Sequence, residues 1–310
     1  TFRQVNGISS AVNNFFDPNN QHTVKVLPFL GEYSWSVIIA SLVLAFCVAA
    51  VLIGGVKRIA SVSQVIVPFM AVIYIVFVLV LVVCNITAVP AAFATIVKAA
   101  FSPKAITGGA VGSFLVAMQK GVARGIFSNE AGLGSAPIAA AAAQTKEPVR
   151  QGLVSMTGTF IDTIVICTLT GLSIVLTGAW QVDGLEGVQV TTYAFQHGLP
   201  FPKELSAFVL MLCLVFFAFT TILGWDYYSE RCLEYLSGGR MKYVKVYRWI
   251  YILAVFIGPY MTVSAVWTIA DIFNGLMALP NMIALFALSG VVVKETKHFF
   301  ERHRNGEIED

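Results

Sequence analysis

Long runs of apolar residues alternate with short polar segments along this 310-residue chain. A run of about 18 or more apolar residues is long enough to cross the hydrocarbon core of a membrane as a helix. Several runs reach that length, so the pattern predicts an all-α polytopic membrane protein with about seven spanning helices. The predicted spans cover residues 35–56, 64–86, 108–143, 152–178, 204–227, 249–265 and 266–293.

The third span is interrupted between residues 121 and 143, where the sequence is GVARGIFSNEAGLGSAPIAAAAA. Each of its interior glycines weakens a helix by about 1 kcal/mol, and Pro137 removes a backbone donor. Ser128, Asn129 and Glu130 bring polar side chains to membrane depth. In lipid, a broken helix persists only where protein or a cavity satisfies its freed backbone groups, and many secondary transporters build their sites on such breaks. We therefore expect the substrate site at this break.

The segments between the spans are predicted to be loops or short surface elements. Residues 1–15 are expected to be the end of a helix whose beginning is absent. The last span carries a second expected interruption, between Gly275 and Pro280. The remaining segments are a polar loop at 16–34, an interfacial helix at 88–104, an acidic loop at 179–203, a basic loop at 229–248 and a charged tail at 294–310.

Composition and charge agree with a membrane protein. The chain is 57% hydrophobic and 12% charged, with a mean hydropathy of +0.78 and a net charge of +3. That charge does not indicate a nucleic-acid partner, because the basic residues lie in loops between spans, where they set orientation. The basic loop 229–248 and the tail 294–310 then face the cytoplasm, with Asp226, Glu230 and Arg231 at the rim. No nucleophile–base pair, metal cluster or cofactor motif is visible, so an enzyme is not expected.

Several stretches resemble one transporter family. The segment at 121–143 is similar to the hallmark segment of the alanine or glycine:cation symporters, the sodium:alanine symporter family. The same resemblance extends through nearly the whole chain. Its further segments are GGVKRIASVSQVIVPFMAVIY at 54–74, VRQGLVSMTGTFIDTIVICTLTG at 149–171, FAFTTILGWDYYSERCLEYL at 217–236 and ADIFNGLMALPNMIALFALSGVVVKETK at 270–297.

The resemblance implies a fold and a location. Its members have the leucine-transporter fold, with two inverted five-helix repeats, and lie in the inner membrane. Residues 1–310 would then form one partial transporter domain. Its parts would be the end of the first repeat at 1–86, the second repeat at 108–293 and a cytoplasmic tail at 294–310. Family members are longer at the N terminus by about three helices, so the first core helices would be missing.

The break offers groups suited to an amino acid. The carbonyls at the end of a half-helix attract an ammonium, and the N–H groups at the start of one attract a carboxylate. We expect Ser128 and Asn129 to bind substrate, with Gly132 allowing close approach and Phe127 forming a wall of a small side-chain pocket. The alternative is a kinked helix whose small residues only pack tightly.

The sequence allows two roles for each of two carboxylates, Glu130 and Asp162. Glu130 either partners Arg124 or freed backbone donors, or carries a coupling proton. Asp162 lies near the middle of its span, where an ionisable residue indicates function by default. Asp162 either takes part in coupling or supports the neighbouring broken helix through a hydrogen bond.

A second polar cluster lies in the span at 204–227. Threonines in membrane helices commonly bond to their own helix, and tryptophan commonly marks the interface. The resemblance implies instead that Thr220 and Thr221 bind sodium and that Trp225 lines the substrate pocket. It also implies a polar contact from Gln4.

The function that follows is sodium-coupled symport of alanine or glycine by alternating access, with sodium as a transported ligand and no cofactor. The expected partners are the small neutral amino acid, sodium and the lipid bilayer. The alternatives are proton-coupled transport of small neutral amino acids and a cation channel, although a channel requires polar groups along a continuous pore.

Overall fold

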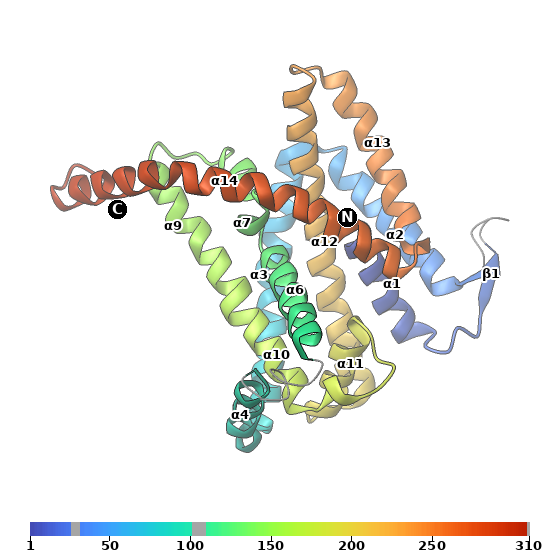
Figure 1. The fold of residues 1–310 in the computed structure, drawn as a ribbon. Coiled ribbons are helices and arrows are strands. Elements are labelled where there is room, and N and C mark those ends of the chain that lie inside the picture. The colour runs from blue at the N-terminus through green and yellow to red at the C-terminus, as the bar shows by residue number, and fades with distance from the viewer. Residues whose placement is uncertain (26–31, 101–109, 309–310) are drawn as a thin grey trace. The chain divides into compact units, whose positions relative to one another are not determined.

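The computed structural model describes residues 1–25, 32–100 and 110–308, which are mostly helical (Figure 1). Two compact units are present, and each is described by itself. Unit 1 contains Thr1–Lys98 and Leu169–Thr268, and unit 2 contains Ala99–Thr168 and Ile269–Asp310. Five of the described helices are long and apolar enough to cross a membrane. They are Trp35–Leu52, Gly55–Cys84, Pro148–Leu176, Lys203–Leu236 and Ser264–Arg304.

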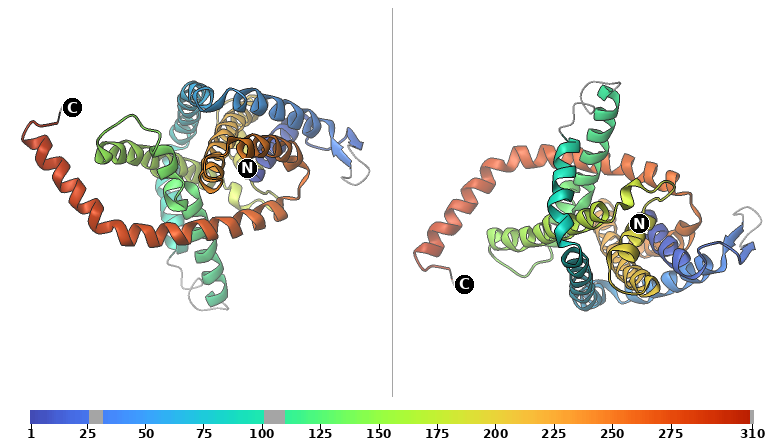
Figure 2. Two further views of the ribbon diagram at one scale, coloured as in Figure 1. Left: turned by 90° about the horizontal axis from the view of Figure 1, so that it is seen from above. Right: turned by 90° about the horizontal axis from the view of Figure 1, so that it is seen from below.

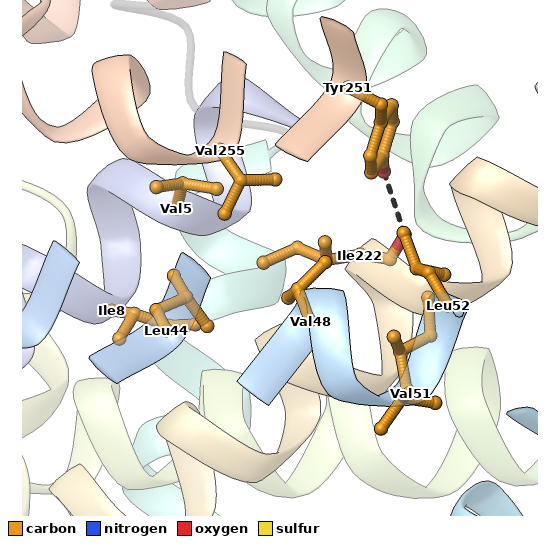
Figure 3. Packing of buried hydrophobic residues seen from close by; sticks show 10 residues of the cluster. Val5, Ile8, Leu44, Val48, Val51, Leu52, Ile222, Tyr251 and Val255 are labelled. Carbon is orange, nitrogen blue, oxygen red and sulfur yellow. Dashed lines mark hydrogen bonds between the residues drawn. The ribbon is translucent and has the colours of Figure 1, made fainter. Parts of the chain in front are cut away.

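Helices α1, α2, α12 and α13 supply the core of unit 1. Their bounds are Phe2–Phe16, Trp35–Leu52, Lys203–Leu236 and Met241–Ile257. Their apolar side chains form one buried cluster, in which Ile8 lies beside Leu44 and Val5 lies beside Val255 (Figure 3). The hydroxyl of Tyr251 donates to the carbonyl of Ile222 across 2.7 Å, which gives the buried phenol a partner within this core.

A small polar substructure joins α1 to α2. Strands β1 (Thr23–Lys25) and β2 (Glu32–Ser34) pair antiparallel, a hairpin that the predicted loop at 16–34 did not include. The carboxylate of Asp17 accepts hydrogen bonds from the Ser34 hydroxyl at 2.6 Å and from the backbone N–H groups of Gln21 and His22. The Ser34 hydrogen bond, followed by these backbone donors, holds the pKa of Asp17 below its ordinary value of 3.8.

The remaining elements of unit 1 flank this core. Helix α3 is Gly55–Cys84, followed by the 3₁₀ turn Ile86–Ala88 and α4, Val89–Ala100. The predicted loop at 179–203 is wrong, because it contains the 3₁₀ turn Ala179–Gln181 and helix α11, Val188–Gly198. One face of α11 is buried through Thr192, Ala194, Phe195 and Gly198. The 3₁₀ turn Gly258–Tyr260 follows α13.

Two predicted helix boundaries are wrong. Helix α3 begins at Gly55, nine residues before the predicted start at 64, so Pro68 lies inside the helix. Helix α12 continues past the predicted end at 227 to Leu236, and α13 begins at Met241, so most of the segment predicted as a basic loop at 229–248 is helical. Helix α12 stops before Gly238 and Gly239, whose φ angles of +64° and +80° turn the chain.

The predicted interruption between Gly275 and Pro280 is also absent. Helix α14 runs without a break over Val263–Arg304, so it contains most of the predicted tail (Figure 2). One proline removes only one backbone hydrogen bond, and membrane helices tolerate it when local adjustments satisfy the freed carbonyl. Figure 2 shows α14 as one curved helix.

Unit 2 contains the predicted break. Helix α6 is Ala110–Ser128, α7 is Glu130–Leu133 and α8 is Ala136–Ala140, so the discontinuity within 121–143 is confirmed. Residues 101–109, which include the start of the predicted span at 108, lie outside the described residues. The next span is helical from Pro148 to Leu176 and comprises α9 (Pro148–Thr159), a π-helical segment (Phe160–Ile166) and α10 (Cys167–Leu176).

Candidate functional site

The break begins where α6 ends at Ser128. Asn129 has the extended backbone of a helix cap, with φ −137° and ψ 147°, and its Oδ1 accepts the N–H of Ala131 at 3.0 Å. This arrangement follows from the sequence, because asparagine is among the preferred residues at a helix N-terminus. The short helix α7 then ends at Gly134, whose φ of +79° is left-handed and whose N–H donates to the Glu130 carbonyl at 3.0 Å.

Two glycines of the break are required by close packing within unit 2. A Cβ on Gly132 would lie 2.4 Å from the carbonyl oxygen of Ile126, because the chain folds back on the end of α6. A Cβ on Gly134 would lie 2.9 Å from the Asn281 side chain. Gly132, predicted as a substrate contact, therefore has a packing reason that does not depend on a ligand.

The amide of Asn281, on α14, stabilises the carbonyl side of the break. Its Nδ2 donates to the carbonyl oxygens of Ala131 at 2.9 Å and Gly132 at 3.1 Å. These are among the backbone groups that a broken membrane helix must satisfy. Sequence reasoning missed Asn281, although a polar amide directly after Pro280 inside an apolar run was a signal that was available.

Ser128 and Asp162 meet in unit 2. The Ser128 hydroxyl donates to Oδ2 of Asp162 across 3.2 Å, so the hydrogen bond considered for Asp162 is present. Asp162 lies in the π-helical segment that follows α9, and such segments frequently occur at functional sites. The Thr159 hydroxyl, on the preceding turn, donates to Oδ1 of Asn129 at 3.3 Å. The break and the π-helical span are thus joined by two side-chain hydrogen bonds.

The other residues in and around the break have different surroundings in the structure. Glu130 is the half-buried first residue of α7. Arg124, its expected partner, makes a bidentate ion pair with Asp271 of α14, at 2.7 and 3.3 Å. Phe127 closes the last turn of α6, and its side chain lies outside the described residues. Ser135 is 1% exposed, and its hydroxyl has no hydrogen-bond partner among the residues that the structure describes.

The predicted sodium ligands lie in unit 1, on α12. The Thr220 hydroxyl is 3.1 Å from the carbonyls of both Phe216 and Phe217, and the Thr221 hydroxyl donates to the Phe217 carbonyl at 2.8 Å. Both threonines therefore bond to their own helix, as threonines in membrane helices commonly do. Each hydroxyl oxygen keeps acceptor capacity for a cation.

The other two predicted residues of unit 1 have few described contacts. Trp225 is half-buried on α12, with its ring edge-on to Tyr228 at 5.9 Å between centroids. Gln4 lies on α1, and its buried Oε1 has no hydrogen-bond partner within the described part of the chain. The structure thus brings Ser128, Asn129 and Asp162 together in one unit, and the residues predicted on α1 and α12 belong to the other unit.

Comparison with known proteins decides the family. The sequence profile of the sodium:alanine symporter family matches residues 2–310. The chain belongs to the sodium:alanine symporter family. The family is one of symporters, which are membrane transport proteins and not enzymes. With its apolar helices, this family member is a multi-pass membrane protein.

Three relatives of this sodium:alanine symporter family chain span a range of similarity. An "Uncharacterized transporter" of Haemophilus influenzae is 51% identical over 97% of this chain and 62% of its own length. The "Sodium/alanine symporter AgcS" of Methanococcus maripaludis is 48% identical over 86% of this chain and 58% of its own. The "Sodium/proton-dependent alanine carrier protein" of Bacillus sp. PS3 is 34% identical over 82% and 59%. The chain thus spans about three fifths of the length of these relatives.

Proposed function

We propose that the protein is a secondary active transporter that couples the import of alanine or glycine to sodium by alternating access around the broken helix at 121–143. The observation that carries this proposal is the polar break of α6 to α8 in a chain of the sodium:alanine symporter family. The name of the relative in Methanococcus maripaludis supports the same substrate and ion. The proposed fold is leucine-transporter-like, with 1–86 ending the first repeat and 108–293 forming the second.

The break supplies groups that match an α-amino acid. Carbonyls left free at the end of α6 suit the substrate ammonium, since a helix C-terminus carries partial negative charge. The amide of Asn129 and the hydroxyl of Ser128 are proposed to make the remaining polar contacts. Gly132 has no side chain, which lets the substrate approach the backbone of the break closely.

Asp162 and Glu130 are proposed to have different roles at the break. Asp162 acts as a positioning residue, because it accepts the Ser128 hydroxyl at the end of α6. Glu130 is kept as the candidate for proton coupling, since it begins α7 within the break. Phe127, Trp225 and Gln4 complete the proposed substrate contacts.

Sodium is proposed to bind at Thr220 and Thr221. It is a hard cation that prefers oxygen ligands, and two adjacent hydroxyls on α12 offer them together with nearby carbonyls. One sodium ion entering down a potential of about 100 mV contributes about 2.3 kcal/mol. At about 1.4 kcal/mol per tenfold, that energy supports an alanine gradient of roughly fortyfold.

The proposed location is the inner membrane, with the C-terminus in the cytoplasm. The basic residues between α12 and the end of α13, and those at the end of α14, then lie on the cytoplasmic side in accord with the positive-inside rule. The only other partners in this proposal are the lipid bilayer and the transported sodium. No cofactor and no nucleic acid is involved.

A second candidate is proton-coupled alanine transport. The relative in Bacillus sp. PS3, which carries sodium and proton in its name, favours it. Under this alternative the fold and the substrate site stay the same, and Glu130 or Asp162 carries the coupling proton.

The test is uptake of radiolabelled alanine into proteoliposomes that hold the full-length protein. One arm has an inward sodium gradient, a second replaces sodium by choline, and a third has only an inward proton gradient. Saturable uptake in the first arm alone is the expected result. Uptake driven by the proton gradient without sodium would support the second candidate. Sodium flux that needs no amino acid and does not saturate would indicate a channel and overturn both.

A further inference from the structure

Two carboxyl groups are buried together on α12 in unit 1. Asp226 is 0% exposed and Glu230 is 3% exposed, so both lie in the interior and not at a solvated rim as the sequence suggested. They are four residues apart on the same helix, which places them on one face, one turn from each other. The interior of unit 1 therefore holds two acidic groups side by side.

One arginine accompanies the two carboxyl groups. Arg248, on α13, donates from Nε to Oε1 of Glu230 at 2.6 Å and from Nη2 to Oε2 at 2.9 Å. This bidentate pair engages both oxygens of Glu230, and each oxygen keeps one further lone pair as an acceptor. Both oxygens of Asp226 have no hydrogen-bond partner among the described residues. With both carboxyl groups ionised, the triad carries a net charge of −1 in a buried site.

The other groups near Asp226 do not supply the missing charge. Tyr251 and Tyr247 face the pair from α13, and Cys232 lies near Tyr247. The Tyr251 hydroxyl donates to the Ile222 carbonyl, and Tyr247 interacts with the hydroxyl of Ser229. Phenol, thiol and hydroxyl groups supply no positive charge, and Arg248 is the cation that the described contacts place against this cluster.

The placement of Asp226 beside Glu230 indicates the missing ligand. The two buried carboxyl groups lie one turn apart on the same face of α12, and no described donor reaches the oxygens of Asp226. Two ionised carboxylates have only acceptors, so a hydrogen bond between them requires one of them to hold a proton. Like-charged carboxyl groups that share a site commonly retain one proton between them for this reason.

We propose that Asp226 and Glu230 form a proton-binding site in which one proton bridges the two carboxyl groups and Arg248 balances the remaining charge. One proton from water binds one carboxylate oxygen, and the net charge of the triad changes from −1 to 0. The site is distinct from Thr220 and Thr221, although α12 carries both. Its link to transport rests on the proposed function, whereas the proton itself is detectable without transport.

The test is infrared difference spectroscopy of the purified full-length protein at pH 7. The Asp226→Asn variant keeps the shape of the side chain, and its amide can donate to Glu230 in place of the proton. The matched control is Glu234→Gln, because Glu234 lies on the same helix, is about one third exposed and pairs with Arg231. We expect a protonated carboxyl C=O band, shifted in D₂O, in the wild type and the control but not in Asp226→Asn.

An identical band in the wild type and Asp226→Asn would overturn the site. If Asp226→Asn does not fold, Asp226→Leu replaces the carboxyl group by an apolar side chain suited to a site without partners, and the same loss of the band is expected. Sodium-driven alanine uptake is measured in parallel. If the band is lost in Asp226→Asn and the wild type takes up alanine, both the site and the transport proposal are supported. If the band is the same in Asp226→Asn and the wild type takes up alanine, the site is rejected and the transport proposal stays intact. If the band is lost in Asp226→Asn but the wild type takes up no alanine, the site is supported and the transport proposal is rejected.

Discussion

The hydroxyl of Ser128 donates to the carboxylate of Asp162 across 3.2 Å and thereby ties the end of α6 to the π-helical segment of the next span. Side chains that are paired in this way act together, so their effects are not additive. We expect Ser128→Ala and Asp162→Ala each to weaken alanine binding, and the double variant to be about as weak as either single one. The expected coupling is about 1 kcal/mol, typical of one hydrogen bond.

A double-mutant cycle on the half-saturation constant for alanine measures this coupling. Asp162→Asn is the informative companion, because it keeps an acceptor for Ser128 while it removes the charge. If Asp162 is a positioning residue, Asp162→Asn should have nearly the alanine affinity of the wild type, and the pH dependence of that affinity should be unchanged. Strictly additive single effects, or a changed pH dependence in Asp162→Asn, would contradict this role.

Gly134 is expected to tolerate no side chain. Its φ of +79° is left-handed, which costs an L-residue roughly 1–2 kcal/mol, and a Cβ would lie 2.9 Å from Asn281. Gly134→Ala should therefore lower the melting temperature of the protein. Gly290→Ala is the control, because Gly290 lies within α14 with open space around it, and alanine is the better helix former there. A melting temperature as low for Gly290→Ala as for Gly134→Ala would contradict the explanation.

Asn281 is expected to stabilise the break through its amide donors. Asn281→Asp keeps the size of the side chain but turns acceptor oxygens toward the carbonyls of Ala131 and Gly132. The loss of two hydrogen bonds and the unfavourable contact should cost about 1–3 kcal/mol. Thermal unfolding in detergent measures the effect, and Asn281→Asp with the stability of the wild type would show that these bonds are not needed.

Asp17 is expected to make the stability of unit 1 depend on pH in the acid range. Its pKa in the folded protein is lowered, chiefly by the hydrogen bond from the Ser34 hydroxyl, which means that the folded state stabilises the ionised carboxylate. A lowered pKa contributes stability that is present above the ordinary value of 3.8 and is lost as the pH falls through the folded value. Asp17→Asn should therefore lower the melting temperature at pH 7 and approach the wild type below about pH 4.

The control for this titration is Asp183→Asn, because Asp183 is an exposed acid in another loop. This variant should have a melting temperature at pH 7 close to that of the wild type. A deficit for Asp17→Asn that is as large at pH 3 as at pH 7 would mean that shape, and not charge, explains the role of Asp17.

Local signals explain which parts of the fold were predictable. The break within 121–143 was found because glycine and asparagine change the backbone conformation at their own positions. The long spans were found because apolar length is itself the requirement for crossing a membrane. Two of the seven predicted spans are not among the five long apolar helices: the broken one, and the one at 249–265, where α13 has 17 residues.

The errors have a common physical origin. Helix α12 extends to Leu236 and α14 extends to Arg304, because a helix that leaves the apolar layer can continue as long as its residues favour helix. Helix α11 was missed because its apolar face is short and lies between glycines. Contacts such as Arg124 with Asp271, 147 residues apart, depend on tertiary packing that the pattern of one chain does not contain.

The measurement that most directly tests the substrate site at the break is equilibrium binding of labelled alanine, with sodium present, to the full-length wild type, Asn129→Ala, Asn129→Asp and the surface control Asn305→Ala. Asn129→Asp keeps the oxygen that caps α7 but replaces the amide donor by a negative charge. We predict that Asn129→Ala and Asn129→Asp both bind alanine at least about tenfold more weakly, a loss of about 1.4 kcal/mol, while Asn305→Ala binds normally. Wild-type affinity in Asn129→Asp would show that Asn129 only caps α7, and it would contradict the proposed substrate site.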